Sequence, residues 1–168
     1  MVQVTAIKPD QEVHLATLTT QTSPLWGLSA ISHANPPVSN ADYIYDDSAG
    51  EGVFSYVFDS GILLKYINFE GRTELGVNTT GGAVTDRTYG TYVTSTVGGR
   101  EYSVAKKTKL IDAQLTGSTK AIIDAGIPVV TAASNANQDA NKYSPANLPE
   151  AIPVAASNSQ YRRWFASN

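Results

Sequence analysis

The run of residues 53–58 constrains the fold more than any other feature of this chain. It reads Val-Phe-Ser-Tyr-Val-Phe, which is apolar, aromatic and β-branched and carries no charge. Such a run is typical of a strand that is buried on both faces in a parallel sheet. The polar turn Asp59-Ser60-Gly61 follows it directly. These residues are therefore expected at the carboxyl end of a parallel strand, where sites form in α/β proteins.

Three more apolar runs predict strands at residues 109–113, 127–133 and 151–156. Between the first two, Ser118 can cap a short helix over residues 119–125, and Gly126 can end it. This order of strand, helix and strand predicts an α/β fold with a mainly parallel sheet. Residues 89–99 are rich in Thr and Val, and their propensity alone favours a strand or a loop there.

Composition narrows the possible chemistry. The 168 residues, 17.9 kDa, fit one domain. Twelve Lys and Arg against fifteen Asp and Glu give a net charge of −3, so we expect no nucleic-acid partner. The absence of Cys excludes disulfides, thiol catalysis and zinc–thiolate sites. Only His14 and His33 are present, too few for a zinc site of three histidines, and we expect neither a metal nor a cofactor.

The sequence also predicts a location. No apolar run approaches the ~18 residues that a membrane helix needs, so we expect no membrane partner. Residues 1–8 lack the charged start and apolar block of a signal peptide, which favours a cytoplasmic location. Residues 1–24 are mostly polar, and their apolar residues alternate with polar neighbours, which predicts a strand or an extended arm.

Segments along nearly the whole chain resemble the subtilisin-like serine proteases, specifically the proteinase K-like fungal branch. Residues 56–61 are similar to the strand that carries the catalytic Asp, residues 89–93 to the His-Gly-Thr-His-Val block that opens the catalytic helix, and residues 132–135 to the Ala-Ala-Gly-Asn segment of the oxyanion hole. Further similar segments are residues 24–28, 31–33, 42–46, 49–52, 69–72, 144–146 and 154–156. The resemblance implies a reduced subtilisin-like three-layer α/β fold, with residues 1–24 as a propeptide-tail-like arm and residues 25–168 as a truncated subtilisin-like domain.

The departures from the family pattern bear on activity. Tyr89 and Tyr92 stand at the two His positions of the catalytic block. The family's Ser-Leu-Gly-Gly strand has no counterpart between Ala113 and Ser118, and the sequence stops before the segment that bears the nucleophilic Ser. Because a phenol stays protonated at neutral pH, Tyr cannot replace His as the base. We therefore expect a pseudoprotease that does not hydrolyse peptides.

The retained polar residues could still do other chemistry. If the family geometry holds, Asp59 faces Tyr89 and accepts a hydrogen bond from its hydroxyl. This pair is the candidate catalytic group for isomerase, cyclase or lyase chemistry on a small molecule such as a secondary metabolite. The candidate binding residues are Tyr92, Asn135, Ser60 and Ser134. In the alternative interpretation Asp59 orients local backbone, the tyrosines fill space, and Asn135 is a turn residue.

Truncation is expected to leave one face of the sheet without a covering layer, which is unstable in water. We expect a second copy of the chain to cover it, as a homodimer. The sequence leaves two functions open. The chain binds a small molecule in its cleft, or it is an interaction module that regulates an active protease as a decoy. A remnant without function is the third possibility.

Overall fold

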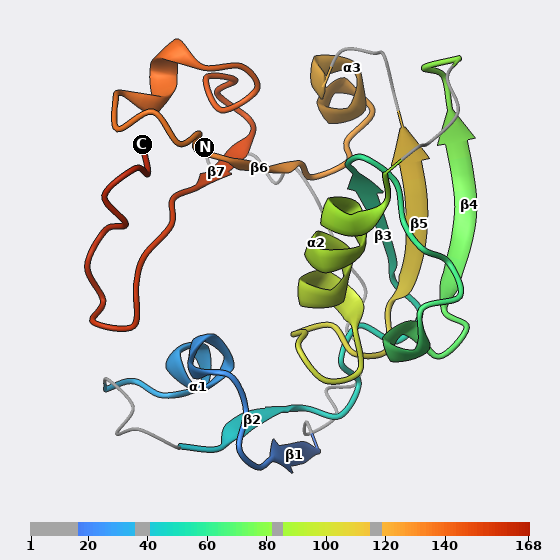
Figure 1. Ribbon diagram of the computed structural model, residues 1–168, viewed down its shortest axis with the longest axis vertical. Helices are drawn as coiled ribbons and strands as arrows, with labels where there is room; N and C mark the ends of the chain where they lie inside the picture. Colours follow the sequence, from blue (N-terminus) through green and yellow to red (C-terminus); the bar gives the residue numbers. More distant parts are fainter. Residues whose placement is uncertain (1–16, 36–40, 82–85, 115–118) are drawn as a thin grey trace, which may run out of the picture.

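The computed structural model describes residues 17–35, 41–81, 86–114 and 119–168 (Figure 1). Helices and strands follow in the order β1 (Leu18–Gln21), α1 (Trp26–Ser32), β2 (Tyr43–Asp46), β3 (Phe54–Phe58), η1 (Ile67–Phe69), β4 (Thr73–Asn78), α2 (Thr88–Gly98), β5 (Lys109–Gln114), α3 (Thr119–Asp124), β6 (Val130–Ala132), η2 (Ala140–Lys142) and β7 (Ile152–Val154).

The main sheet has the order β3-β5-β4, and both pairs are parallel. The register sets Tyr56 of β3 and Glu74 of β4 opposite Ile111 of the central strand β5. The predicted strands at 53–58 and 109–113 are confirmed, and so is the helix that precedes Gly126. β6 and β7 are shorter than the predicted runs and pair with each other in a separate parallel sheet.

The core lies between one face of the main sheet and the segments that cross it. Its buried centre is Val57, Ile62, Phe69 and Leu110. Partly buried side chains of α2 and the η1 region pack against this centre: Leu64, Tyr66, Val93 and Val97. β3 and β5 thus contribute one apolar face to this core, as expected of strands in a layered α/β fold.

Propensity alone favoured a strand or a loop at residues 89–99. This prediction was wrong, because helix α2 spans Thr88–Gly98. The hydroxyl groups of this segment do not compete with the helix, because they donate to carbonyl oxygens one turn earlier. Thr94 Oγ1 donates to Gly90 O at 2.6 Å, and Ser95 Oγ donates to Thr91 O at 2.9 Å. Thr94 is fully buried. Tertiary packing therefore outweighs the weak helix propensity of Thr and Val.

The N-terminal part forms its own two-stranded sheet, in which β1 pairs antiparallel with β2. The strand prediction for residues 1–24 is confirmed at β1, whereas residues 1–16 lie outside the described residues. Lys106 Nζ lies 5.6 and 5.5 Å from the ring centroids of Tyr43 and Tyr45, a cation–π arrangement. Burial lowers the pKa of Lys106. The boundary at residue 24 stays a prediction.

No described element covers the face of the main sheet opposite the core. This agrees with the expected loss of a covering layer, but the predicted burial of β3 on both faces is wrong. This face carries Phe54, Tyr56 and Phe58, which are 57%, 54% and 46% exposed. Their alternation with the buried Val57 places all three on one face of β3. In the described parts of the chain, no helix is long and apolar enough to cross a membrane.

Candidate functional site

Asp59 and Ser60 lie where β3 ends, as predicted, and both bond to backbone there. Asp59 Oδ1 accepts a hydrogen bond from the N–H of Ser60 at 2.6 Å. Ser60 Oγ accepts one from the N–H of Gly90 at 3.2 Å, in the first turn of α2. N–H groups in that turn have no partner within a helix. The hydroxyl of Ser60 therefore joins the start of α2 to the end of β3.

Tyr89 and Tyr92 lie side by side on α2, with ring centroids 6.4 Å apart. They are 65% and 70% exposed. Among the described residues, no hydrogen bond joins the hydroxyl of Tyr89 to Asp59, whose carboxylate is engaged with its own turn. The expected Asp59–Tyr89 hydrogen bond is thus not formed.

Ser134 and Asn135 lie after β6, which belongs to the separate sheet of β6 and β7. Asn135 is exposed. The loop that begins with it is held by Asn168, whose Oδ1 accepts hydrogen bonds from the N–H groups of Ala136 at 2.8 Å and Gln138 at 3.1 Å. The predicted site residues therefore fall into two groups, one at the junction of β3 and α2 and one beyond β6.

Ser134 has a φ of +83°, a region that L-residues rarely adopt, at the position where the similar family segment has Gly. We expect Ser134→Gly to raise the free energy of unfolding by about 1 kcal/mol, because it removes Cβ strain that exceeds the entropic cost of Gly. Urea unfolding followed by circular dichroism measures the change. An unchanged or lower midpoint would contradict the strain assigned to Ser134.

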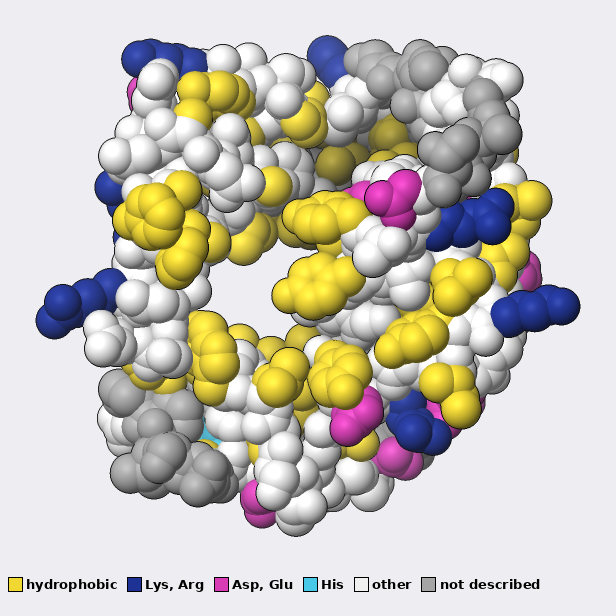
Figure 2. All heavy atoms as spheres, in the orientation of Figure 1, with side chains coloured by type: hydrophobic (Ala, Val, Ile, Leu, Met, Phe, Trp, Pro, Cys, Tyr) yellow, Lys and Arg dark blue, Asp and Glu magenta, His cyan; other side chains and the backbone are white. Residues whose placement is uncertain are grey.

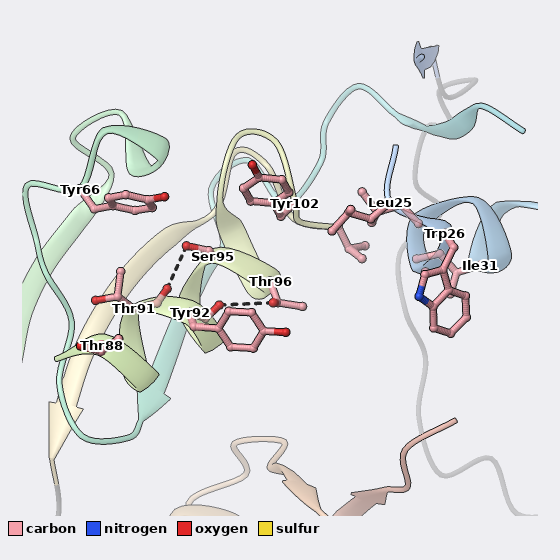
Figure 3. A pocket seen from close by; sticks show the side chains of 13 residues that line it. Leu25, Trp26, Ile31, Tyr66, Thr88, Thr91, Tyr92, Ser95, Thr96 and Tyr102 are labelled. Carbon is pink, nitrogen blue, oxygen red and sulfur yellow. Dashed lines mark hydrogen bonds between the residues drawn. The ribbon is translucent and has the colours of Figure 1, made fainter. Parts of the chain in front are cut away.

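A cavity with a volume of about 770 Å³ lies between α1 and α2. Figure 3 shows Leu25, Trp26 and Ile31 on one side, with Tyr66, Tyr92 and Tyr102 facing them across the open space. The remaining lining residues are Gly27, Leu28, Thr88, Thr91, Ser95, Thr96 and Val104. Among the sequence-predicted site residues, only Tyr92 lines this cavity.

The polar groups of the cavity are hydroxyls at the edge of an apolar wall. Ser95 Oγ and Thr96 Oγ1 donate to the carbonyl oxygens of Thr91 and Tyr92, at 2.9 and 3.3 Å (Figure 3). Their lone pairs remain available as acceptors. The negative charge of Glu101 raises the pKa of Tyr102, so this phenol stays protonated and can donate a hydrogen bond. The cavity therefore offers hydroxyl groups and an apolar surface.

Sequence reasoning did not identify the cavity residues Trp26, Tyr66 and Tyr102. They come from three separate segments, and only tertiary packing brings them to one cavity. The excess of Tyr was the one signal in the sequence, with nine residues of this type in the chain.

No protein-family model matches the chain. It is 34% identical over 212 aligned positions to Alkaline protease 1 of Aspergillus flavus, covering 99% of this chain and 52% of that protein. It is 36% identical to an alkaline proteinase of Hapsidospora chrysogena, covering 94% and 50%, and 35% identical to Subtilisin-like protease 2 of Trichophyton verrucosum, covering 98% and 52%. The chain is a homologue of the fungal subtilisin-like proteases. It spans about half the length of the curated relatives it matches.

A solved structure has the same fold as this chain. The subtilisin homologue superimposes on a cold-adapted subtilisin-like serine proteinase with a TM-score of 0.71, covering 86% of this chain and 68% of that one at 24% identity. The predicted subtilisin-like α/β fold is therefore confirmed. The alignment to the Aspergillus flavus protein has 212 positions while the homologue has 168 residues, so at least 44 aligned positions have no counterpart in it.

Proposed function

We propose that this subtilisin homologue is non-proteolytic and binds a small apolar molecule in the cavity between α1 and α2. The observation that carries the proposal is the cavity itself. Its volume of about 770 Å³ falls within the range of about 300–1,000 Å³ that is typical of small-molecule sites.

Among the described residues, no imidazole hydrogen-bonds to Asp59, and this supports the absence of peptide hydrolysis. Serine proteases need an imidazole that takes the proton of the nucleophile and is oriented by the acid. At the position that the resemblance assigns to this imidazole, the homologue has Tyr89. His33, the histidine within the described residues, ends α1, where its Nδ1 lies 2.9 Å from Ser29 O and 3.0 Å from Ser32 Oγ.

The lining supports binding of an apolar ligand. Leu25, Trp26 and Ile31 are 59%, 47% and 62% exposed, a large apolar surface for one short helix. A ligand that lies between them and Tyr92 removes apolar surface from water on both sides, at about 25 cal/mol per Å². The hydroxyls of Thr96 and Tyr102 would orient a polar group of the ligand. The candidate acid–base chemistry of Asp59 and Tyr89 stays a prediction and is not part of this proposal.

The ligand test uses the fluorescence of Trp26. The variant Trp164→Phe leaves Trp26 as the single indole, because the chain has two Trp. We expect naphthalene and geraniol, as aromatic and terpenoid probes, to change the Trp26 emission with saturation at micromolar to millimolar concentration, corresponding to about −8 to −4 kcal/mol. A linear response to both probes, without saturation, would contradict the proposed site.

A matched pair of variants locates the binding. Thr96→Phe adds a ring at the cavity wall and should weaken probe binding about tenfold, whereas Ser159→Phe adds the same ring at an exposed position outside the cavity lining and should leave it unchanged. Equal effects of the two substitutions would show that the probes bind elsewhere.

Hydrolysis is tested separately with Asp59→Ala. An Asp in a working triad contributes about 10⁴-fold to the rate of hydrolysis. We expect the parent and the variant to release the chromophore from a peptide anilide at the same background rate. A lower rate for the variant would assign a hydrolytic role to Asp59 and would leave the ligand site unaffected.

A further inference from the structure

The outer edge of β3 is unpaired. Within the described parts of the chain, β3 bonds only to β5. The N–H of Lys109 donates to Val53 O at 2.9 Å, so residues 53, 55 and 57 direct their backbone groups toward β5. Because backbone groups alternate sides along a parallel strand, Phe54, Tyr56 and Phe58 direct theirs away from β5. No described residue hydrogen-bonds to these backbone groups.

These three residues also carry the uncovered aromatic side chains described above. β3 has no charge or Pro, the features with which proteins protect an edge strand against pairing. Its composition is that of a strand with neighbours on both sides. In the part of the chain that the structure describes, the same three residues of β3 therefore have backbone groups without a neighbouring strand and side chains without a covering layer.

Among the described strands, β6 also has an outer edge without a neighbouring strand, in the two-stranded sheet that it forms with β7. Ile152 N donates to Val129 O and Ala133 N to Val154 O, both at 2.9 Å, so residues 129, 131 and 133 are turned toward β7. The backbone groups of Val130 therefore point away from β7. Val130 is also 67% exposed. In the described structure β3 and β6 are thus both edge strands, as are β4 and β7 at the other edges of the same two sheets.

The space beside β3 decides which partner fits. Figure 1 shows β6, β7 and the C-terminal segment across a central opening from α2 and the main sheet against which α2 packs. Figure 2 shows that the opening persists with all side chains drawn and that hydrophobic side chains line it. An extended chain can enter such an opening, whereas a second folded copy would have to bring the elements that surround its own β3 edge into the same opening. The Aspergillus flavus protein has at least 44 positions in the aligned region that have no counterpart in this chain.

We propose that an extended segment of a different polypeptide enters this opening and pairs with β3 as an additional strand. The segment is uncharged and rich in β-branched and aromatic residues, because it faces Phe54, Tyr56 and Phe58 on one side of the sheet. Main-chain hydrogen bonds provide affinity in this mode of recognition, and side-chain pockets provide specificity. The proposal concerns a protein partner and does not depend on the ligand site between α1 and α2.

The test uses synthetic peptides of about 12 residues that tile the longest stretch of the Aspergillus flavus protein without a counterpart here, with scrambled peptides as controls. We expect at least one peptide to slow hydrogen exchange at the amides of Phe54, Tyr56 and Phe58 about tenfold. Exchange at Ser55 and Val57 should not change, since their amides already bond to β5. If no peptide slows the three edge amides, the proposal is wrong.

A pair of variants tests the backbone contact. Tyr56→Pro removes an edge N–H that β5 does not use, and we expect about tenfold weaker peptide binding, whereas Tyr56→Thr keeps the N–H and retains binding. If Tyr56→Pro does not fold, Tyr56→Lys places a charge at the same edge and should have the same effect. Edge amides protected without peptide, together with a doubled mass by light scattering, would assign the edge to a second copy and overturn the proposal.

Discussion

Gly90→Ala is expected to lower the free energy of unfolding by about 3 kcal/mol. A Cβ at this position would meet the backbone O, C and N atoms of Gly61, with the oxygen nearer than any real Cβ contact. Backbone atoms cannot rotate away as a flexible side chain can, and Gly61 itself has a φ of +113°. The first turn of α2 would have to move away from the end of β3, which also breaks the hydrogen bond between Gly90 N and Ser60 Oγ.

The matched control is Gly27→Ala in α1, where a Cβ meets nothing within 4 Å. Because Ala favours a helix over Gly, this substitution should be neutral or stabilising by up to about 1 kcal/mol. Urea unfolding of both variants by circular dichroism gives the two values. If Gly90→Ala stays within about 0.5 kcal/mol of the parent, the close contact between α2 and Gly61 is not a constraint in solution.

Phe69→Ala is expected to cost about 3–5 kcal/mol, the range for removing a buried aromatic ring. Phe69 is completely buried in the core beneath α2 and packs edge to face against Tyr66, with ring centroids 5.4 Å apart. Tyr66 lines the cavity, so the loss of Phe69 also removes support from the cavity wall. Stability and binding of the naphthalene probe should therefore decrease together.

Ile67→Ala provides the control on the same 3₁₀ helix, since Ile67 is 78% exposed. We expect this substitution to change stability by no more than about 0.5 kcal/mol and to leave probe binding intact. A comparable loss for both variants would mean that η1 as a whole, rather than the buried ring, determines stability.

Strands with a strong apolar signal were predictable because burial on both sides selects their residues. The central strand β5 follows this rule. β3 has the apolar run, but it is an edge strand and one of its faces is exposed, and β4 has no such run. β4 lies at an edge and includes Glu74 and Gly76, with Leu75 and Val77 mostly exposed. Edge strands need no continuous apolar run, so the composition of β4 resembles that of a loop. Pairing with β5, which depends on residues far along the chain, makes it a strand.

The candidate site was predictable only in its local parts. The polar turn after residue 58 was expected at a strand end and lies there, but the partner of Ser60 is the backbone of Gly90 rather than a ligand. The cavity could not be anticipated, because its two walls come from α1 and α2, which are about sixty residues apart. For α2 itself, the match to a known family sequence predicted a helix where propensity did not.

The position of β5 at the centre of the main sheet has a consequence for synthesis on the ribosome. β3 and β4 are both translated before their common partner, and β4 ends at Asn78 while β5 ends at Gln114. At typical rates of 5–20 residues per second, the nascent chain carries two unpaired strands for roughly 2–7 s. During that interval β3 displays both of its edges, and aggregation competes with folding. The speed of translation through residues 79–114 thus sets how long the growing chain depends on chaperones.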